Sequence, residues 1–300
     1  QKFTSEGEFV SKWGTEGSGD GQFQSPRGVA VALDDGSVYV SDSLNNRIQK
    51  FTSGGEFVTK WGTEGTDDGQ FMAPRGIAVS PDGSVYVSDT TNRIQKFTSE
   101  GEFVTKWGTY GSGDGSFIFP SSVAVASDGS VYVSDVNNHR VQKFTSEGEF
   151  VTKWGTYGSG DGQFQYSARG VAIAPDGSVY VSEYANLRPH QIQKFTSEGV
   201  FVSKWGSEGS DDGEFNEPHG VAVASDGSVY VADSRNNRIQ KFPVGSVGRI
   251  ETPVFVNKWG TSGTGEGEFR YPHGVAVASD GNVYVSDSLN NRIQKFNAAG

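Results

Sequence analysis

Short apolar runs, separated by glycine-rich polar turns, repeat along the whole chain. One unit reads, in order, a small-residue run such as RGVAVA, a turn (SDG or PDG), the run SVYVSD, a loop ending in NNR, the run RIQKF, the turn TSEGE and the run FVTKW. Runs of this length, rich in Val, Ile, Tyr and Phe, predict β-strands, and no segment shows the period of an amphipathic helix. Each unit therefore predicts four strands.

The period of the repeat indicates how these strands are arranged. The chain has six tryptophans, each in a KWG triplet and 46 to 54 residues from the next, a spacing typical of propellers and solenoids: Trp13, Trp61, Trp107, Trp154, Trp205 and Trp259. GVAVA, SVYV and RIQKF are apolar on both faces, so each sheet must be covered on both sides. Small residues in the first strand fit the crowding near a shared axis. We therefore predict an all-β, six-bladed β-propeller of four-stranded antiparallel blades, with residues 1–300 as a single domain.

The two ends of the chain predict how the ring closes. Residues 8–13, EFVSKW, form a fourth strand with no earlier strands before it, and the last unit stops after its third strand. We expect residues 8–13 to complete the last blade, which removes two exposed sheet edges. The triplet QKF occurs at residues 1–3 and at 294–296, so we expect the first copy to be displaced. Because the chain starts inside a repeat, we expect it to be a fragment of a longer protein.

The patterns F-x-x-P-x-G-V-A-V, D-G-S-V-Y-V-S-D and N-N-R-I-Q-K-F closely resemble the NHL repeat, and the resemblance covers essentially the whole chain. It implies a six-bladed NHL propeller. Members of this family serve as interaction platforms in RNA-regulatory proteins, as sensor domains of receptor kinases and in prokaryotic surface proteins, and a few related propellers are metal-dependent lyases or lactonases. The resemblance favours a monomeric domain at the cell surface or outside the cell, but fold alone does not decide function.

Composition excludes several kinds of site. The net charge of -11 disfavours nucleic acid and anionic membranes as partners. The absence of cysteine excludes disulfides, thiolate metal ligands and a cysteine nucleophile. No apolar run is long enough to span a bilayer, so we expect no membrane insertion. No GxSxG, Walker or HExxH motif is present, and we assign neither a catalytic residue nor a cofactor.

One position varies between units and is the main candidate for binding. It directly precedes the glycine of the first strand, or the matching serine in the third unit, and is occupied by Arg27, Arg75, Ser121, Arg169, His219 and His273, which we call the mouth ring. In a propeller these residues converge at one end of the central channel, where arginines could hold a carboxylate, sulfate or phosphate. The alternative is that each side chain bonds to carbonyls or carboxylates of adjoining loops. With His190, Tyr166 and Tyr271, we expect the ring to bind a protein, peptide or glycan.

Three other functions stay open. Three histidines could hold a catalytic metal for a hydrolase or lyase, with Glu183 as the acid: His190, His219 and His273. Aromatic residues near the arginines could stack on single-stranded RNA: Phe119, Tyr166, Tyr271, Tyr110 and Tyr157. The domain could also be a structural spacer of a surface protein. The acidic loops offer only one or two carboxylates each, which disfavours calcium.

Other features of the repeat are predicted to be architectural. Each second strand ends in an acid that is followed by an arginine, and we expect these pairs to hold the loops closed: Asp42 and Arg47, Asp89 and Arg93, Asp135 and Arg140, Glu183 and Arg188, Asp233 and Arg238, Asp287 and Arg292. Two units carry insertions, at 184–191 and 243–255. These are either partner contacts or variable surface loops.

Overall fold

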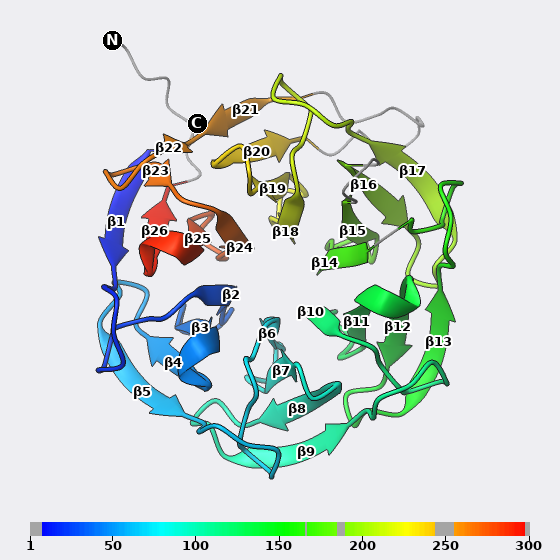
Figure 1. Ribbon diagram of the computed structural model, residues 1–300, viewed down its shortest axis with the longest axis horizontal. Helices are drawn as coiled ribbons and strands as arrows, with labels where there is room; N and C mark the ends of the chain where they lie inside the picture. The colour runs from blue at the N-terminus through cyan, green and yellow to red at the C-terminus, as the bar shows by residue number, and fades with distance from the viewer. Residues whose placement is uncertain (1–7, 166, 185–189, 244–254, 298–300) are drawn as a thin grey trace.

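The computed structural model describes residues 8–165, 167–184, 190–243 and 255–297. They form six four-stranded sheets arranged around a central axis like the blades of a propeller (Figure 1). Within each blade, strands that follow one another in sequence pair antiparallel. The predicted all-β, six-bladed architecture is confirmed. No helix in the described part of the chain is long and apolar enough to cross a membrane.

The strands of a blade run outward from the axis in chain order, except that β1 is the outermost strand of the last blade. The first three blades contain β2 (Pro26–Val31), β3 (Val38–Asp42), β4 (Arg47–Phe51), β5 (Phe57–Trp61); β6 (Ile77–Val79), β7 (Val85–Asp89), β8 (Arg93–Phe97), β9 (Phe103–Trp107); β10 (Pro120–Val125), β11 (Val131–Asp135), β12 (Arg140–Phe144) and β13 (Phe150–Trp154). The next three contain β14 (Ser167–Ile173), β15 (Val179–Tyr184), β16 (His190–Phe195), β17 (Phe201–Trp205); β18 (Pro218–Val223), β19 (Val229–Asp233), β20 (Arg238–Phe242), β21 (Asn257–Trp259); β24 (Pro272–Val277), β25 (Val283–Asp287), β26 (Arg292–Phe296) and β1 (Phe9–Trp13).

Short elements complete the loops between strands. One loop is closed by the two-residue parallel pair β22 (Thr261–Ser262) and β23 (Glu268–Phe269), and single parallel bridges occupy the same place in the other five. Three loops contain a turn of 3-10 helix: η1 (Ser43–Asn45), η2 (Val136–Asn138) and η3 (Ser288–Asn290). The two sequence insertions fall largely on residues 185–189 and 244–254, outside the described residues, so their expected roles stay predictions.

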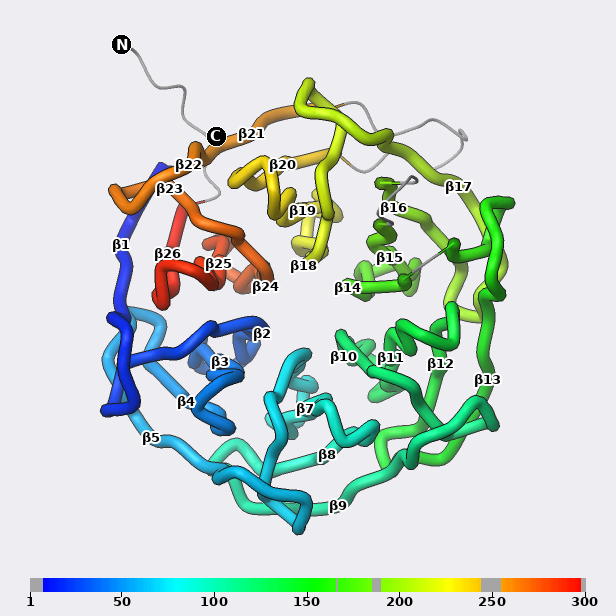
Figure 2. Tube along the Cα trace, viewed as in Figure 1, coloured from blue at the N-terminus to red at the C-terminus, as the bar shows by residue number. Residues whose placement is uncertain are grey.

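The ring closes as the termini predict. β1 pairs antiparallel with β26, and Trp13 lies opposite Ile293. Figure 2 follows the chain once around the ring until β24, β25 and β26 stand beside β1. The second QKF copy, Gln294–Phe296, occupies the third strand of this blade, and the first copy lies outside the described residues. Closure pairs the outer edge of β26, which would otherwise be free to associate with other chains.

Hydrophobic clusters lie between neighbouring blades rather than inside one sheet. In the cluster between the first two blades, Tyr39 and Ile48 face Phe71 and Phe97. Trp61 joins the two sides, because its ring lies 6.2 Å from that of Tyr39 and 5.9 Å from that of Phe97. Such aromatic pairs add to the free energy of burial. Apolar residues on both faces of each sheet are therefore used, as the sequence pattern predicts.

Glycine in the first strand lets neighbouring blades touch at the axis. A Cβ atom on Gly28 would lie 2.3 Å from the carbonyl oxygen of Arg75 in the next blade, and one on Gly274 would lie 2.4 Å from that of Arg27. Only a residue without a side chain permits this approach. As a result, the residues that precede these glycines are held close together around the channel.

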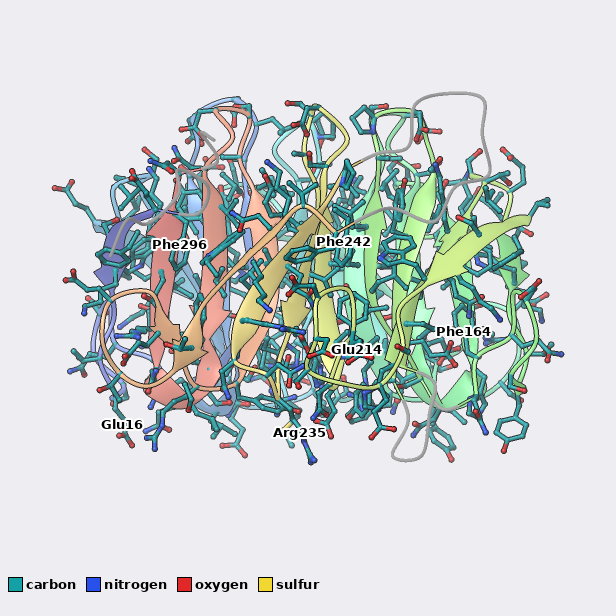
Figure 3. All side chains as sticks on the ribbon, turned by 90° about the horizontal axis from the view of Figure 1, so that it is seen from above. Glu16, Phe164, Glu214, Arg235, Phe242 and Phe296 are labelled. Atoms are coloured by element: carbon teal, nitrogen blue, oxygen red, sulfur yellow. The ribbon has the colours of Figure 1, made fainter. Side chains whose placement is uncertain are left out.

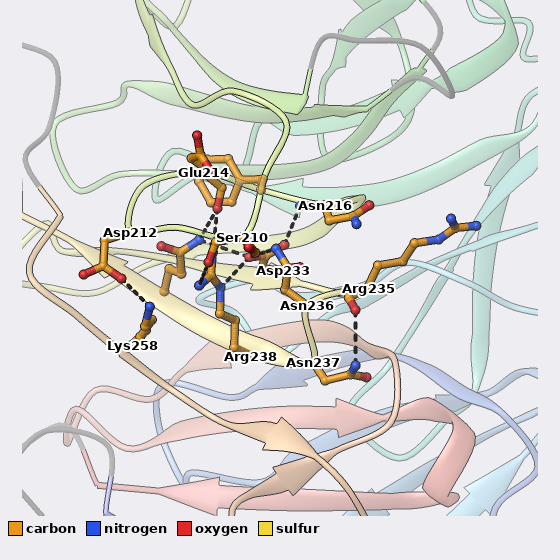
Figure 4. Close-up of polar contacts among 12 residues, drawn as sticks. Ser210, Asp212, Glu214, Asn216, Asp233, Arg235, Asn236, Asn237, Arg238 and Lys258 are labelled. Carbon is orange, nitrogen blue, oxygen red and sulfur yellow. Dashed lines mark hydrogen bonds and ion pairs between the residues drawn. The ribbon is translucent and has the colours of Figure 1, made fainter.

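In five of the six blades a buried carboxylate and an arginine hold the acidic loop in place, and Figure 4 shows the pair of the fifth blade. In the fifth blade, Arg238 Nε donates to Asp233 at 2.7 Å, and its other nitrogens donate to three loop carbonyls at 2.6 to 2.8 Å. The predicted pairs form in five blades. The fourth blade differs: Gln191, not Arg188, stands opposite Glu183 in the sheet and donates to it at 2.8 Å, because the extra loop residues precede Gln191 while the register of the strands is kept. Arg188 lies outside the described residues.

A cationic ring at the channel mouth

The inner strands bring the six residues of the mouth ring to one end of the central channel. Arg27, Arg75 and Arg169 stand there with Ser121, His219 and His273 around a cavity of about 510 Å³, part of which is open solvent. Below them the wall consists of the following glycines or Ser122, and then of valine or isoleucine. The convergence predicted from the repeat is therefore present in the structure.

The backbone of the mouth ring is fixed by serine hydroxyls of the neighbouring blade. Ser41 accepts a hydrogen bond from the N–H of Gly28 at 2.7 Å and donates to the carbonyl of Arg75 at 2.5 Å. Equivalent hydroxyls donate to four other ring carbonyls, namely Ser88 to Ser121, Ser134 to Arg169, Ser182 to His219 and Ser286 to Arg27. In the fifth blade Ala232 replaces the serine. The ring backbone is thus structural, whatever the side chains do.

Two arginines of the ring have no polar partner among the described residues. Neither Arg27 nor Arg75 makes a side-chain hydrogen bond or ion pair with a described residue, and Arg75 Nε is buried without a partner. Arg75 instead stacks on Phe119, with its Cζ 4.0 Å from the ring centroid. Burial, and next the charges of Arg27 and Arg169, lower the pKa of Arg75 to about 9. Burial and the charge of Arg169 also lower the pKa of Arg27. Among the described residues, neither arginine makes the bonds to adjoining loops that the alternative expects.

The third arginine is positioned by a residue that sequence reasoning did not select. Arg169 donates from Nη2 to the hydroxyl of Tyr184 at 3.0 Å and from Nε to Ser167 at 3.2 Å, and its Cζ lies 4.9 Å from the Tyr184 ring. Tyr184 ends β15, where other units have Ser, Thr or Val after the acid. That departure from the repeat was the signal that could have identified it.

A hydrogen-bond chain behind the ring sets the tautomer of His219. Arg235 Nε pairs with Glu217 at 2.8 Å, so Glu217 is a carboxylate, and it accepts the hydroxyl proton of Tyr271 at 2.7 Å. The Tyr271 oxygen, 3.0 Å from His219 Nε2, must then accept, which places the ring proton on Nε2. His219 Nδ1 is an acceptor without a partner among the described residues. Burial, and next its bond to Glu217, raise the pKa of Tyr271.

The two ring histidines lie against each other and are uncharged near neutral pH. The ring centroids of His219 and His273 are 4.4 Å apart. Burial lowers the pKa of both imidazoles well below 6.5. The Arg169 charge is the next cause for His219, and contact with His219 is the next cause for His273. Formal charge at the mouth therefore comes from the three arginines. The wall chemistry is that of an anion site: guanidinium donors, a hydroxyl and neutral imidazoles.

The structure does not bring the proposed metal ligands together. His190 is buried and does not line the channel cavity, and its Nδ1 lies 3.2 Å from both the backbone nitrogen of Glu217 and the carbonyl oxygen of Phe215. Glu183 accepts hydrogen bonds from Gln165, Gln191 and Gln193 inside its own blade. Among the described residues, no group of three or more His, Cys, Asp or Glu could hold a metal ion.

The remaining aromatic candidates are spread over the face of the mouth. Tyr110 and Tyr157 are 74% and 65% exposed on the acidic loops, and Tyr166 lies outside the described residues. The loop carboxylates lie at the rim of the disc, where lysines of the outermost strands pair with them, as Lys60 does with Asp20. Figure 3 shows this face edge-on, with Glu16 and Arg235 at its surface.

Comparisons with known proteins agree with this geometry. The NHL repeat family matches residues 23–51, 71–97, 117–144, 215–242 and 269–296, and the unmatched unit is the fourth blade with its Glu183 and Gln191 pair. No curated protein matches the chain.

Solved structures with the same fold are distant in sequence. A protein of unknown function from Bacteroides thetaiotaomicron has a TM-score of 0.67 at 19% identity, covering 98% of this chain and 76% of that one. Virginiamycin B lyase from Staphylococcus aureus has 0.64 at 16%, covering 97% and 99%, and a gluconolactonase from Xanthomonas campestris has 0.64 at 13%, covering 92% and 88%. These likenesses show the fold alone. With five matched repeats and six blades of one strand order, the chain belongs to the NHL-repeat family of six-bladed β-propellers.

Proposed function

We propose that this propeller is a non-catalytic binding platform whose mouth ring holds an anionic group of a protein, peptide or glycan partner. The observation that carries the proposal is the unpaired state of Arg27 and Arg75 with respect to the described residues. Both side chains are half-buried, and charged groups that lose part of their water on burial are normally paired. Two guanidinium groups beside Arg169, with no described carboxylate in the cavity wall, are satisfied best by an anion from outside.

The positioning of the ring supports binding by a rigid site. Its backbone is fixed by the serine hydroxyls, Arg75 rests on Phe119 and Arg169 is held by Tyr184. Little side-chain freedom is lost when a ligand binds such a preorganised site, so more of the interaction energy appears as affinity. The ring is the positive part of an otherwise acidic molecule, which also guides anionic groups to the mouth.

A calorimetric titration tests the proposal with two anionic probes, a peptide carrying three glutamates and a sialylated oligosaccharide. The double variant Arg27→Gln/Arg75→Gln removes the unpaired charges. The matched control, Lys60→Gln/Lys106→Gln, removes two exposed cations that pair with loop carboxylates on the same face. We expect wild type and control to bind at least one probe with equal affinity, and the double arginine variant to bind at least tenfold more weakly.

Two results would overturn the proposal. One is that neither probe binds the wild-type chain. The other is that both double variants lose affinity equally, since binding would then depend on net charge and not on the mouth ring. Circular dichroism of each variant confirms that the propeller is folded before it is titrated.

A further inference from the structure

The other end of the channel is a wider, apolar opening. There the ends of the six inner strands and the turns that follow surround about 960 Å³, part of which is open solvent; we call this opening the funnel. Its inner wall is aliphatic and consists of Val31, Val79, Val125, Ile173, Val223 and Val277. Its lip is formed by Leu33, Pro81, Ser127, Pro175, Ser225 and Ser279. Leu33 is 56% exposed at this lip, so its side chain adds apolar surface at the entrance of the funnel.

The funnel is surrounded by carboxylates. Each of the six lip residues is followed directly in the chain by an exposed aspartate, namely Asp34, Asp82, Asp128, Asp176, Asp226 and Asp280, and Asp35 adds a seventh acid in the first blade. The hydroxyl of Ser80 and the N–H of Ser84 lower the pKa of Asp82, and the N–H of Ser130 lowers the pKa of Asp128. The two ends of the channel therefore carry opposite charge.

The basic residues of this face do not cancel the acidic rim. Each third strand, farther from the axis, carries a lysine whose ammonium group lies over the tyrosine ring of the second strand. Lys96, for example, lies 5.4 Å from the Tyr86 centroid and donates to the carbonyl of Ser146 at 3.2 Å. Beyond the lysines, outer turns add Glu100, Glu147 and Glu198, so acids outnumber the cations among the described residues of this face.

We propose that the funnel is a second binding site, for a short basic and apolar peptide segment of a partner protein. The space in the funnel that water-sized groups can occupy is about 360 Å³, within the range of about 300–1,000 Å³ usual for ligand sites. A single small cation could contact only some of the aspartates around the funnel. A segment with several lysines or arginines around a central apolar residue matches both the wall and the rim.

Fluorescence anisotropy with labelled synthetic peptides tests this site. The first peptide has two leucines flanked on each side by two lysines, the second replaces both leucines with serine, and the third replaces the lysines with glutamates. We expect only the first to bind tightly. Affinity should fall as salt rises from 50 to 500 mM, because the rim charges are exposed and screened; these concentrations span Debye lengths of roughly 14 to 4 Å.

Variants show whether the peptide binds at the funnel or is attracted only by the net negative charge of the protein. Asp82→Asn/Asp128→Asn/Asp226→Asn removes three rim charges, and asparagine retains the side-chain oxygen that accepts the turn N–H. The matched control, Glu100→Gln/Glu147→Gln/Glu198→Gln, removes three charges from outer turns of the same face. We expect a loss of at least tenfold for the aspartate variant and less than twofold for the control. Leu33→Ser should weaken binding severalfold without unfolding the chain, since the side chain is already exposed.

The outcomes decide the proposal. Equal losses in the two triple variants, equal binding of the serine peptide, or tighter binding of the glutamate peptide would each overturn it. The Arg27→Gln/Arg75→Gln variant should bind the lysine peptide as the wild type does, because its changes lie at the opposite end of the channel.

Discussion

Replacing one buried arginine should cost far more stability than replacing an exposed lysine of the same blade. We expect Arg238→Ala to lower the free energy of unfolding by about 3–5 kcal/mol, because it leaves a buried carboxylate without its cation. We expect Lys258→Ala to cost under about 1 kcal/mol, as is usual for exposed ion pairs. Figure 4 shows both pairs in the fifth blade.

The difference follows from the contacts of the two cations. The Arg238 side chain is 6% exposed and makes four charged hydrogen bonds, one to Asp233 and three to carbonyls of Ser210, Asp211 and Glu214. Each such bond is worth about 1.5–3 kcal/mol net, but water entering the loop recovers part of the loss, so the sum is an upper bound. The Lys258 side chain is 40% exposed and contacts Asp212, which is 53% exposed. Solvent screens that pair and replaces it easily.

Urea unfolding, followed by tryptophan fluorescence and far-ultraviolet circular dichroism, measures these differences. The double variant Asp233→Ala/Arg238→Ala should lose less stability than the two single variants lose together, because each single change leaves a buried charge without its partner. If Arg238→Ala unfolds within about 1 kcal/mol of Lys258→Ala, the buried pair does not hold the loop and the reasoning is refuted.

Three further predictions concern closure, the axis and pH. Trp13→Ala should destabilise the chain as much as Trp61→Ala, by about 3–5 kcal/mol, because ring closure puts both between two blades; a near wild-type urea midpoint for Trp13→Ala would contradict closure. Gly28→Ala should sharply lower the thermal midpoint, since its Cβ would meet a carbonyl of the next blade, and an unchanged midpoint would argue against that contact. The free energy of unfolding should fall as pH drops below 6.5. His219 and His273 become protonated in the unfolded chain at that pH, whereas in the folded chain their lowered pKa keeps them neutral. The slope should reach about 1.4 kcal/mol per pH unit for each histidine, and glutamine at both positions should flatten the pH dependence of the urea midpoint.

The fold could be predicted from the sequence because six copies of one pattern each define the same four strands. Trp13 illustrates why closure was also predictable: its KWG triplet identifies a fourth strand without partners, and β26 is the third strand that lacks a fourth. The position of the mouth ring followed from the same counting. Where the unit length changes, counting fails, as the exchange of Arg188 for Gln191 opposite Glu183 shows.

The polar contacts of the ring could not be predicted in the same way. The chain from Glu217 to Tyr271 joins residues 54 positions apart in different blades, and its direction depends on side-chain rotation that no repeat encodes. His190 was expected to face the mouth but is turned toward Glu217 of the next blade. These contacts are set by tertiary distances between loops that differ from the consensus unit.

Comparing the six units distinguishes side chains that hold the fold together from side chains that can bind a ligand. Arg47 donates hydrogen bonds to Asp42 and to carbonyls of the acidic loop, so a change at either position lowers stability. Five of the six units keep this pair. At Arg27 the reverse holds, since the carbonyl is bonded by Ser286 while the guanidinium is bonded to no described residue. Such a position tolerates Arg, Ser or His without loss of fold. A ligand can therefore determine which side chains stand there. This is why our proposal places binding specificity in the mouth ring and not in the carboxylate–arginine pairs.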